Sequence, residues 1–176
     1  MKISHAAASA ALLLCHVASQ AAAHAHVHGV AKLDVAVEPT RISIQLDSPL
    51  DNLIGFERAP RTAAESALAD AAVSKLRASA SMFRIDPAAQ CRPASFELSS
   101  SALKLGTPNP EEEKEGHADI DGSFEFACVD AGKAKYIEVG LFEFARLQGL
   151  EVQVATPHGQ FKRDLKRPAT RISLGK

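Results

Sequence analysis

Three histidines alternate with apolar residues at positions 24, 26 and 28 of the sequence. On an extended chain, alternate side chains project to the same side, so the three imidazoles would share one face. Neutral imidazole binds zinc, copper and nickel, and three ring nitrogens nearly complete a tetrahedral zinc shell. The spacing therefore predicts a metal site made by His24, His26 and His28. The alternative is an exposed chain terminus that merely contains histidine.

A second alternating group of possible metal ligands consists of His117, Asp119 and Asp121. We expect these side chains on the outer face of a strand whose inner face carries Phe124 and Phe126. An imidazole beside carboxylates is a reasonable half-site for a metal, and we predict His117 and Asp119 as ligands. A polar strand face exposed to solvent is the alternative. The sequence leaves open whether this strand neighbours the N-terminal histidines.

The remaining reactive side chains form no recognisable catalytic group. The sequence has no Gly-x-Ser-x-Gly motif, no His-Glu-x-x-His motif and no glycine-rich loop of the kind that binds phosphate. We expect His158, in a Pro-His-Gly turn, to be exposed. For Glu57, next to Phe56, we favour a structural role over metal ligation. The sequence thus predicts that the protein is not an enzyme.

Residues 1–23 have the pattern of a signal peptide. Lys2 precedes an apolar run at 6–18, and small residues end at Ala23. The run is too short to span a bilayer, and no later segment is apolar enough to do so. We expect cleavage before His24, which leaves an exported metal-binding domain at 24–176. Its free α-amino group would be a further nitrogen ligand.

Cysteine content and charge narrow the class of protein further. Removal of the signal peptide leaves Cys91 and Cys128, and two cysteines in an exported chain most simply form one disulfide. The chain has 20 basic and 21 acidic residues, which argues against nucleic-acid binding. With 176 residues, 46% of them hydrophobic, it can form one domain, which we expect to be monomeric.

Hydrophobic periodicity predicts an α+β fold. Apolar residues alternate from Ala31 to Leu46 around a turn at 38–40, which predicts a hairpin. Thr62 and Glu65 form a capping box ahead of a helix from Ala63 to about Phe83. A short helix is expected at 141–147, and further strands are expected at 92–98, 102–105, 119–128, 135–139, 151–155, 160–165 and 171–174. We predict a single domain with a mainly antiparallel sheet of six to eight strands and one long helix packed on it.

Five segments of the sequence form a recognisable set: His-Ala-His-Val-His-Gly at 24–29, the loop at 48–60, Ala-Gln-Cys at 89–91, His-Ala-Asp-Ile at 117–120 and Phe-Glu-Phe-Ala-Cys at 124–128. Together they resemble the ZrgA-like family of zinc-regulated periplasmic zinc-binding proteins, formerly a domain of unknown function. The resemblance implies a periplasmic location in a Gram-negative bacterium and a role in zinc acquisition beside an uptake system. The chain differs from such proteins at Arg58, where they tend to have histidine, and at 107–116, where they often have a His/Asp-rich loop.

We therefore predict a periplasmic zinc-binding protein that captures or buffers zinc in support of zinc uptake. Its partners would be the metal ion and a metal-uptake transporter. One alternative is a periplasmic interaction module that docks on a transporter or envelope partner, with metal binding incidental. Another is copper binding at the N-terminal histidines, because an amine and nearby imidazoles favour copper(II).

Overall fold

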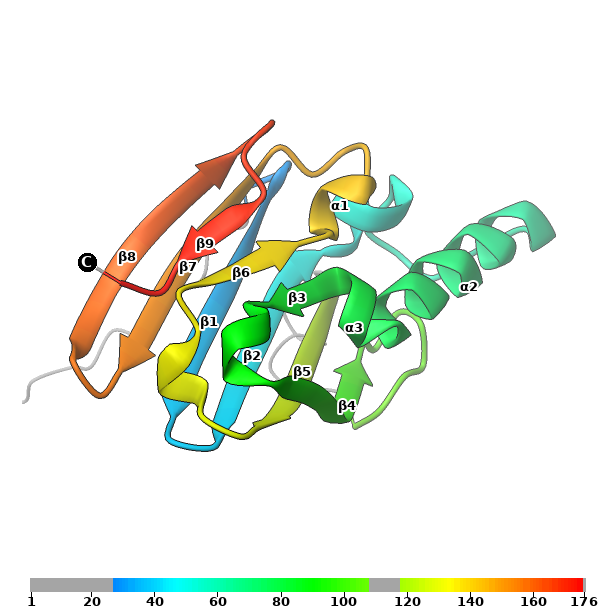
Figure 1. The fold of residues 1–176 in the computed structure, drawn as a ribbon. Helices are drawn as coiled ribbons and strands as arrows, with labels where there is room; N and C mark the ends of the chain where they lie inside the picture. The colour runs from blue at the N-terminus through cyan, green and yellow to red at the C-terminus, as the bar shows by residue number, and fades with distance from the viewer. Residues whose placement is uncertain (1–26, 108–117, 176) are drawn as a thin grey trace, which may run out of the picture.

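The computed structural model describes residues 27–107 and 118–175, and in this part of the chain the elements form two layers (Figure 1). The strands are β1 Val30–Glu38, β2 Arg41–Pro49, β3 Phe83–Ile85, β4 Cys91–Ser99, β5 Asp119–Cys128, β6 Tyr136–Val139, β7 Gly149–Thr156, β8 Gly159–Lys166 and β9 Arg171–Ser173. The helices are α1 Leu50–Ile54, α2 Ala63–Arg77 and α3 Ser79–Met82, and short 3-10 turns cover Pro87–Ala89, Ala131–Lys133 and Leu141–Glu143. The signal peptide predicted at 1–23 lies outside the described residues.

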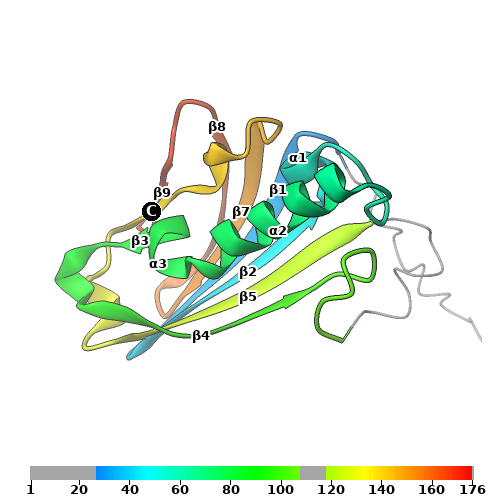
Figure 2. The same ribbon diagram turned by 90° about the vertical axis from the view of Figure 1, so that its right-hand side faces the viewer.

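Six strands form the large sheet, in the order β4-β5-β2-β1-β7-β8. All neighbours in it are antiparallel except β1 and β7, which are parallel. The antiparallel strands β3-β6-β9 form a small second sheet. The small sheet and the helices lie on the same side of the large sheet (Figures 1 and 2). The predicted α+β class is confirmed, but the strands make two sheets instead of the single sheet expected.

The predicted hairpin at 31–46 is present as β1 and β2, with Val35 opposite Ile44. Its inward residues are buried, because this face of the large sheet is covered by the second layer. The core between the layers includes Phe83 of β3 and Phe124 of β5, whose ring centroids are 4.9 Å apart. The described helices are neither long nor apolar enough for any of them to cross a membrane.

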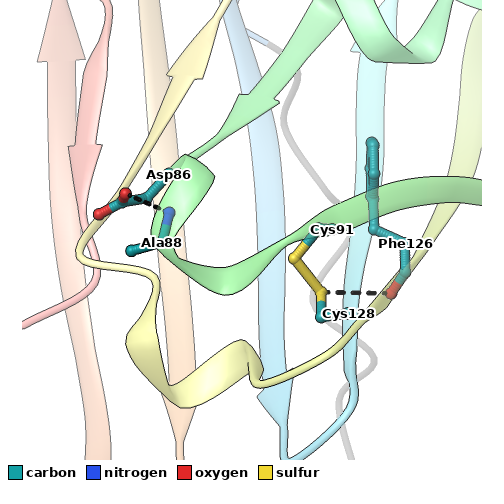
Figure 3. The surroundings of a disulfide bond; sticks show 5 residues. All are labelled: Asp86, Ala88, Cys91, Phe126 and Cys128. Atoms are coloured by element: carbon teal, nitrogen blue, oxygen red, sulfur yellow. Dashed lines mark hydrogen bonds between the residues drawn. A yellow bond between two sulfur atoms is a disulfide. The ribbon is translucent and has the colours of Figure 1, made fainter.

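The predicted disulfide between Cys91 and Cys128 is present and joins β4 to β5 (Figure 3). The two cysteines lie directly opposite each other in the strand register. Their sequence separation is 37 residues. A cross-link over a loop of this length stabilises a fold by about 3–4 kcal/mol in the chain-entropy model.

The helix predicted from Ala63 to about Phe83 is correct to Arg77 and is interrupted at Ala78. It ends at Arg77, because Ala78 has a non-helical backbone (φ −79°, ψ 56°), and only a short α3 follows. Phe83 already belongs to β3, where it pairs with Val139 of β6. Strand pairing and burial of the Phe83 ring therefore override the local helix propensity.

Three shorter segments also differ from the prediction. The strand expected at 102–105 is a turn, closed by a single bridge between Ser100 and Leu105, and Lys104 has a positive φ of 55°. The helix expected at 141–147 is a single 3-10 turn. The segment after β2, expected to be a loop, contains the short helix α1, which ends at Gly55 with φ 88°.

The N-terminus of α2 is fixed by the predicted capping box. Thr62 Oγ1 accepts a hydrogen bond from the Glu65 N–H at 3.1 Å, and the Glu65 carboxylate accepts one from the Arg61 N–H at 2.6 Å. The same carboxylate accepts two further bonds from Arg58, at 2.8 and 2.7 Å. The hydrogen bonds from Arg58, followed by the bond from the Arg61 backbone, lower the pKa of Glu65 to about 2.

Replacing Phe124 should test the core directly. Phe124→Ala removes a fully buried ring, so we expect the free energy of unfolding to fall by about 3–5 kcal/mol. Phe96→Ala is the matched control, because Phe96 lies opposite Phe124 on edge strand β4 and is 42% exposed. Urea unfolding of both variants measures the difference. Equal losses for the two variants would contradict the described core.

The Glu65 contacts should make stability depend on pH. Because the pKa of Glu65 is lower in the folded protein than its ordinary 4.5, its stabilising effect is complete above about pH 4.5 and is lost as the pH falls toward 2. The difference in unfolding free energy between wild type and Glu65→Gln should shrink over this range. Denaturant titrations at several pH values measure it, and a difference independent of pH would show that these contacts are not formed.

Candidate metal site

His28 lies at the corner of a tight turn that leads into β1. The Val30 N–H donates to the Val27 carbonyl at 3.0 Å, which closes a four-residue turn. Gly29 occupies the third position with φ +83°, a conformation that such turns allow mainly to glycine. The His28 side chain, 63% exposed, therefore projects from the end of the large sheet.

The side chain of Asn52 in α1 holds this turn in place. Its Oδ1 accepts from the Gly29 N–H at 2.6 Å, and its Nδ2 donates to the Val30 carbonyl at 2.8 Å. On the other side, the Gly29 carbonyl accepts from the backbone N–H groups of Gln148 and Gly149, at 2.7 and 2.9 Å. Asn52 is completely buried, so these bonds form away from water. The backbone next to His28 is thus fixed from both sides.

Two carboxylates lie beside the His28 ring. Nε2 is 2.8 Å from Oε1 of Glu57, and Nδ1 is 3.9 Å from Oδ2 of Asp51. The Glu57 oxygen is shielded from solvent and has no aligned hydrogen bond among the described residues, so its contact with His28 is close but not directed along an N–H. An imidazole nitrogen and a carboxylate oxygen are donor atoms that suit zinc.

The predicted ligands are only partly within the described residues. His24, His26 and His117 lie outside them. Asp119 begins β5, is buried, and lies opposite Pro49 of β2. Because β2 separates β1 from β5, these two strands begin at the same end of the sheet but two strand spacings apart, about 10 Å. His158, in the turn between β7 and β8, is exposed as predicted.

Among the described residues, no group of three or more His, Cys, Asp or Glu side chains is placed to hold a metal ion. His28 and Glu57 are therefore a pair of donors and not a complete site. We did not predict the contact of Glu57 or the proximity of Asp51 from the sequence. The only local signal for them is that two acidic residues flank the apolar turn at 53–56.

Arg58, at a position where the family resemblance leads us to expect histidine, is turned toward α2. Its guanidinium bonds Glu65 and lies 4.7 Å from the centre of the Phe56 ring. Arginine cannot ligate zinc because it stays protonated. Arg58 therefore anchors the N-terminus of α2 through Glu65, and Glu57 is the residue of this loop that contacts His28.

The fold and this site define an α+β domain that presents a histidine and carboxylate pair at one end of its large sheet. The profile described as "ZrgA family zinc uptake protein" matches residues 25–174, more than four-fifths of the chain. The chain belongs to this family, and membership indicates a role in zinc uptake with the zinc ion as a partner. Among curated proteins, a sequence search finds no match to the chain.

The role of Asn52 can be tested by removing its amide. Asn52→Ala leaves the Gly29 N–H without its acceptor, so we expect the free energy of unfolding to fall by about 1–3 kcal/mol. The Gly29 amide should also exchange faster with solvent. Gln148→Ala is the control, because it removes an exposed amide from the same region and should change stability by less than about 0.5 kcal/mol. Equal effects of the two changes would exclude the anchoring role.

Proposed function

We propose that the protein binds zinc in the periplasm and captures or buffers it for an uptake transporter. The observation that carries this proposal is the 2.8 Å contact between His28 Nε2 and Glu57 Oε1 at the exposed end of the large sheet. Family membership makes zinc the expected ion. The proposed site consists of this pair together with His24 and His26, which precede it in the sequence.

The chemistry of the pair favours a bound cation. A neutral imidazole nitrogen with a free lone pair and a carboxylate oxygen are both hydrogen-bond acceptors and repel each other at this distance unless a positive charge lies between them. Zinc binds such atoms at about 2.0–2.2 Å, which separates two ligands of a tetrahedral site by about 3.3 Å. The pair therefore has to open by about 0.5 Å, and both side chains are accessible enough to move. A protonated His28 would instead form an ordinary ion pair with Glu57.

The other ligands of this site come from the same short segment. His26 is two residues from His28, and two residues of chain span at most about 7 Å. His26 can therefore approach the ion bound by His28 without any change in the fold, and His24 or the mature α-amino group can supply a fourth donor. Asp119 belongs to β5, two strand spacings away, so we assign it to a separate, second group of ligands together with His117, which lies outside the described residues.

This arrangement suits a protein that releases its metal. The proposed ligands lie on a chain terminus and a surface loop, so the ion stays accessible to a partner. We propose that the protein carries zinc without a chemical step. Acid should weaken binding, because a protonated imidazole has no lone pair for the metal.

Zinc titration of residues 24–176 tests the proposal. We expect His28→Ala to weaken zinc affinity by more than about a hundredfold and Glu57→Gln by about tenfold, since even outer partners of zinc ligands contribute about 10–100-fold. His158→Ala removes another exposed histidine and should leave the affinity unchanged. Zinc binding that His28→Ala does not alter would reject the site. A preference for copper(II) in a competition titration would favour the copper alternative.

A further inference from the structure

The Asp51 carboxylate is held by Arg146 next to the His28 ring. Arg146 Nη2 donates to Oδ1 and Oδ2 of Asp51, each at 2.9 Å, and Arg146 Nε lies 3.2 Å from Oδ2. Nε also donates to the backbone carbonyl of Asp51 at 3.1 Å. The fork of the guanidinium thus fixes both the side chain and the backbone of Asp51.

The Arg146 side chain lies against the end of α1. A Cβ built at Gly55, the residue that caps this helix, would lie 3.6 Å from Cδ of Arg146, which is an ordinary van der Waals distance. Arg146 belongs to the segment before β7, whose Gln148 and Gly149 N–H groups bind the Gly29 carbonyl. One segment therefore fixes both the backbone beside His28 and the carboxylate beside its ring.

We propose that Asp51, held by Arg146, is a positioning residue that orients the His28 imidazole for zinc. This inference rests on the proposed function and adds residues that do not touch the metal. In the zinc-bound protein Asp51 would accept a hydrogen bond from the Nδ1–H of His28, which would leave the lone pair of Nε2 directed toward Glu57 and the ion. Histidines that bind metals generally donate their second N–H to a carboxylate, carbonyl or water in this way.

The geometry needs only a small adjustment. Nδ1 of His28 and Oδ2 of Asp51 are 3.9 Å apart, so a movement of about 1 Å brings them to hydrogen-bond distance. The opening of the Nε2 to Glu57 contact that zinc requires is smaller, about 0.5 Å, and the His28 ring that has to move is 63% exposed. Asp51 itself is only 11% exposed and stays in place.

The ion pair between Asp51 and Arg146 differs from the ordinary surface ion pairs of this protein. Arg84, for example, is as exposed as Arg146 and pairs with Glu138, but its carboxylate partner is shared with Arg171 of a neighbouring strand. That pairing links β3, β6 and β9. The carboxylate bound by Arg146 instead lies beside an imidazole nitrogen at the proposed metal site, so its loss should affect zinc more than stability.

The experiment measures zinc affinity, the stability of the metal-free protein and the tautomer of His28. Asp51→Asn keeps the shape but removes the charge, and we expect about 10–100-fold weaker zinc binding. Arg146→Lys keeps the charge but loses the two-pronged contact, and it should have a smaller effect in the same direction. Arg84→Lys is the matched control and should leave zinc affinity unchanged. Because the Glu57 carboxylate competes for a proton on Nε2, the tautomer is measured in metal-free Glu57→Ala. Nitrogen-15 NMR should show His28 mainly with its proton on Nδ1 there, a preference that adding Asp51→Asn should abolish.

Unchanged affinity and an unchanged His28 tautomer in Asp51→Asn would overturn the inference. So would a loss of affinity matched only by a loss of stability, because that is a structural effect. If the wild type takes up no zinc, the proposed function is rejected, but the role of Asp51 is not yet decided. The tautomer in metal-free Glu57→Ala then still decides whether Asp51 orients the ring.

Discussion

The buried Asn52 side chain joins the turn before β1 to the helix after β2, and the position of His28 depends on this link. The Asn52 amide accepts a hydrogen bond from the Gly29 N–H and donates one to the Val30 carbonyl. The Gly29 carbonyl in turn accepts hydrogen bonds from the N–H groups of Gln148 and Gly149, at the start of β7. An unsatisfied amide is costly in a buried position, so the three segments have to form together. The exposed His28 side chain is thereby held beside the 51–57 region.

The charges around His28 have separate partners. Arg146 binds Asp51 and Arg58 binds Glu65, which leaves Glu57 as the carboxylate that faces Nε2 of the ring. Arginine at position 58 therefore takes no part in the described pair, because its guanidinium binds Glu65 at the start of α2. The site combines a fixed backbone with two side chains that can separate slightly to admit an ion.

Much of this fold could be predicted from local patterns. The hairpin at 31–46, the inward face of β5, the capping box at Thr62 and the disulfide all follow from periodicity, capping chemistry or cysteine count. The end of α2 and the second sheet could not, because Phe83 leaves its helical pattern only to pair with β6 and pack on Phe124. The contacts of Asp51 and Glu57 with His28 join residues more than 20 positions apart and depend on the turn that Asn52 holds. No short sequence pattern encodes them.

A crystal structure of zinc-loaded residues 24–176, with anomalous diffraction recorded at the zinc edge, tests the central claim most directly. The account predicts an anomalous peak about 2.0–2.2 Å from both Nε2 of His28 and a carboxylate oxygen of Glu57. A zinc ion bound elsewhere, with the His28 and Glu57 side chains still in direct contact, would contradict it.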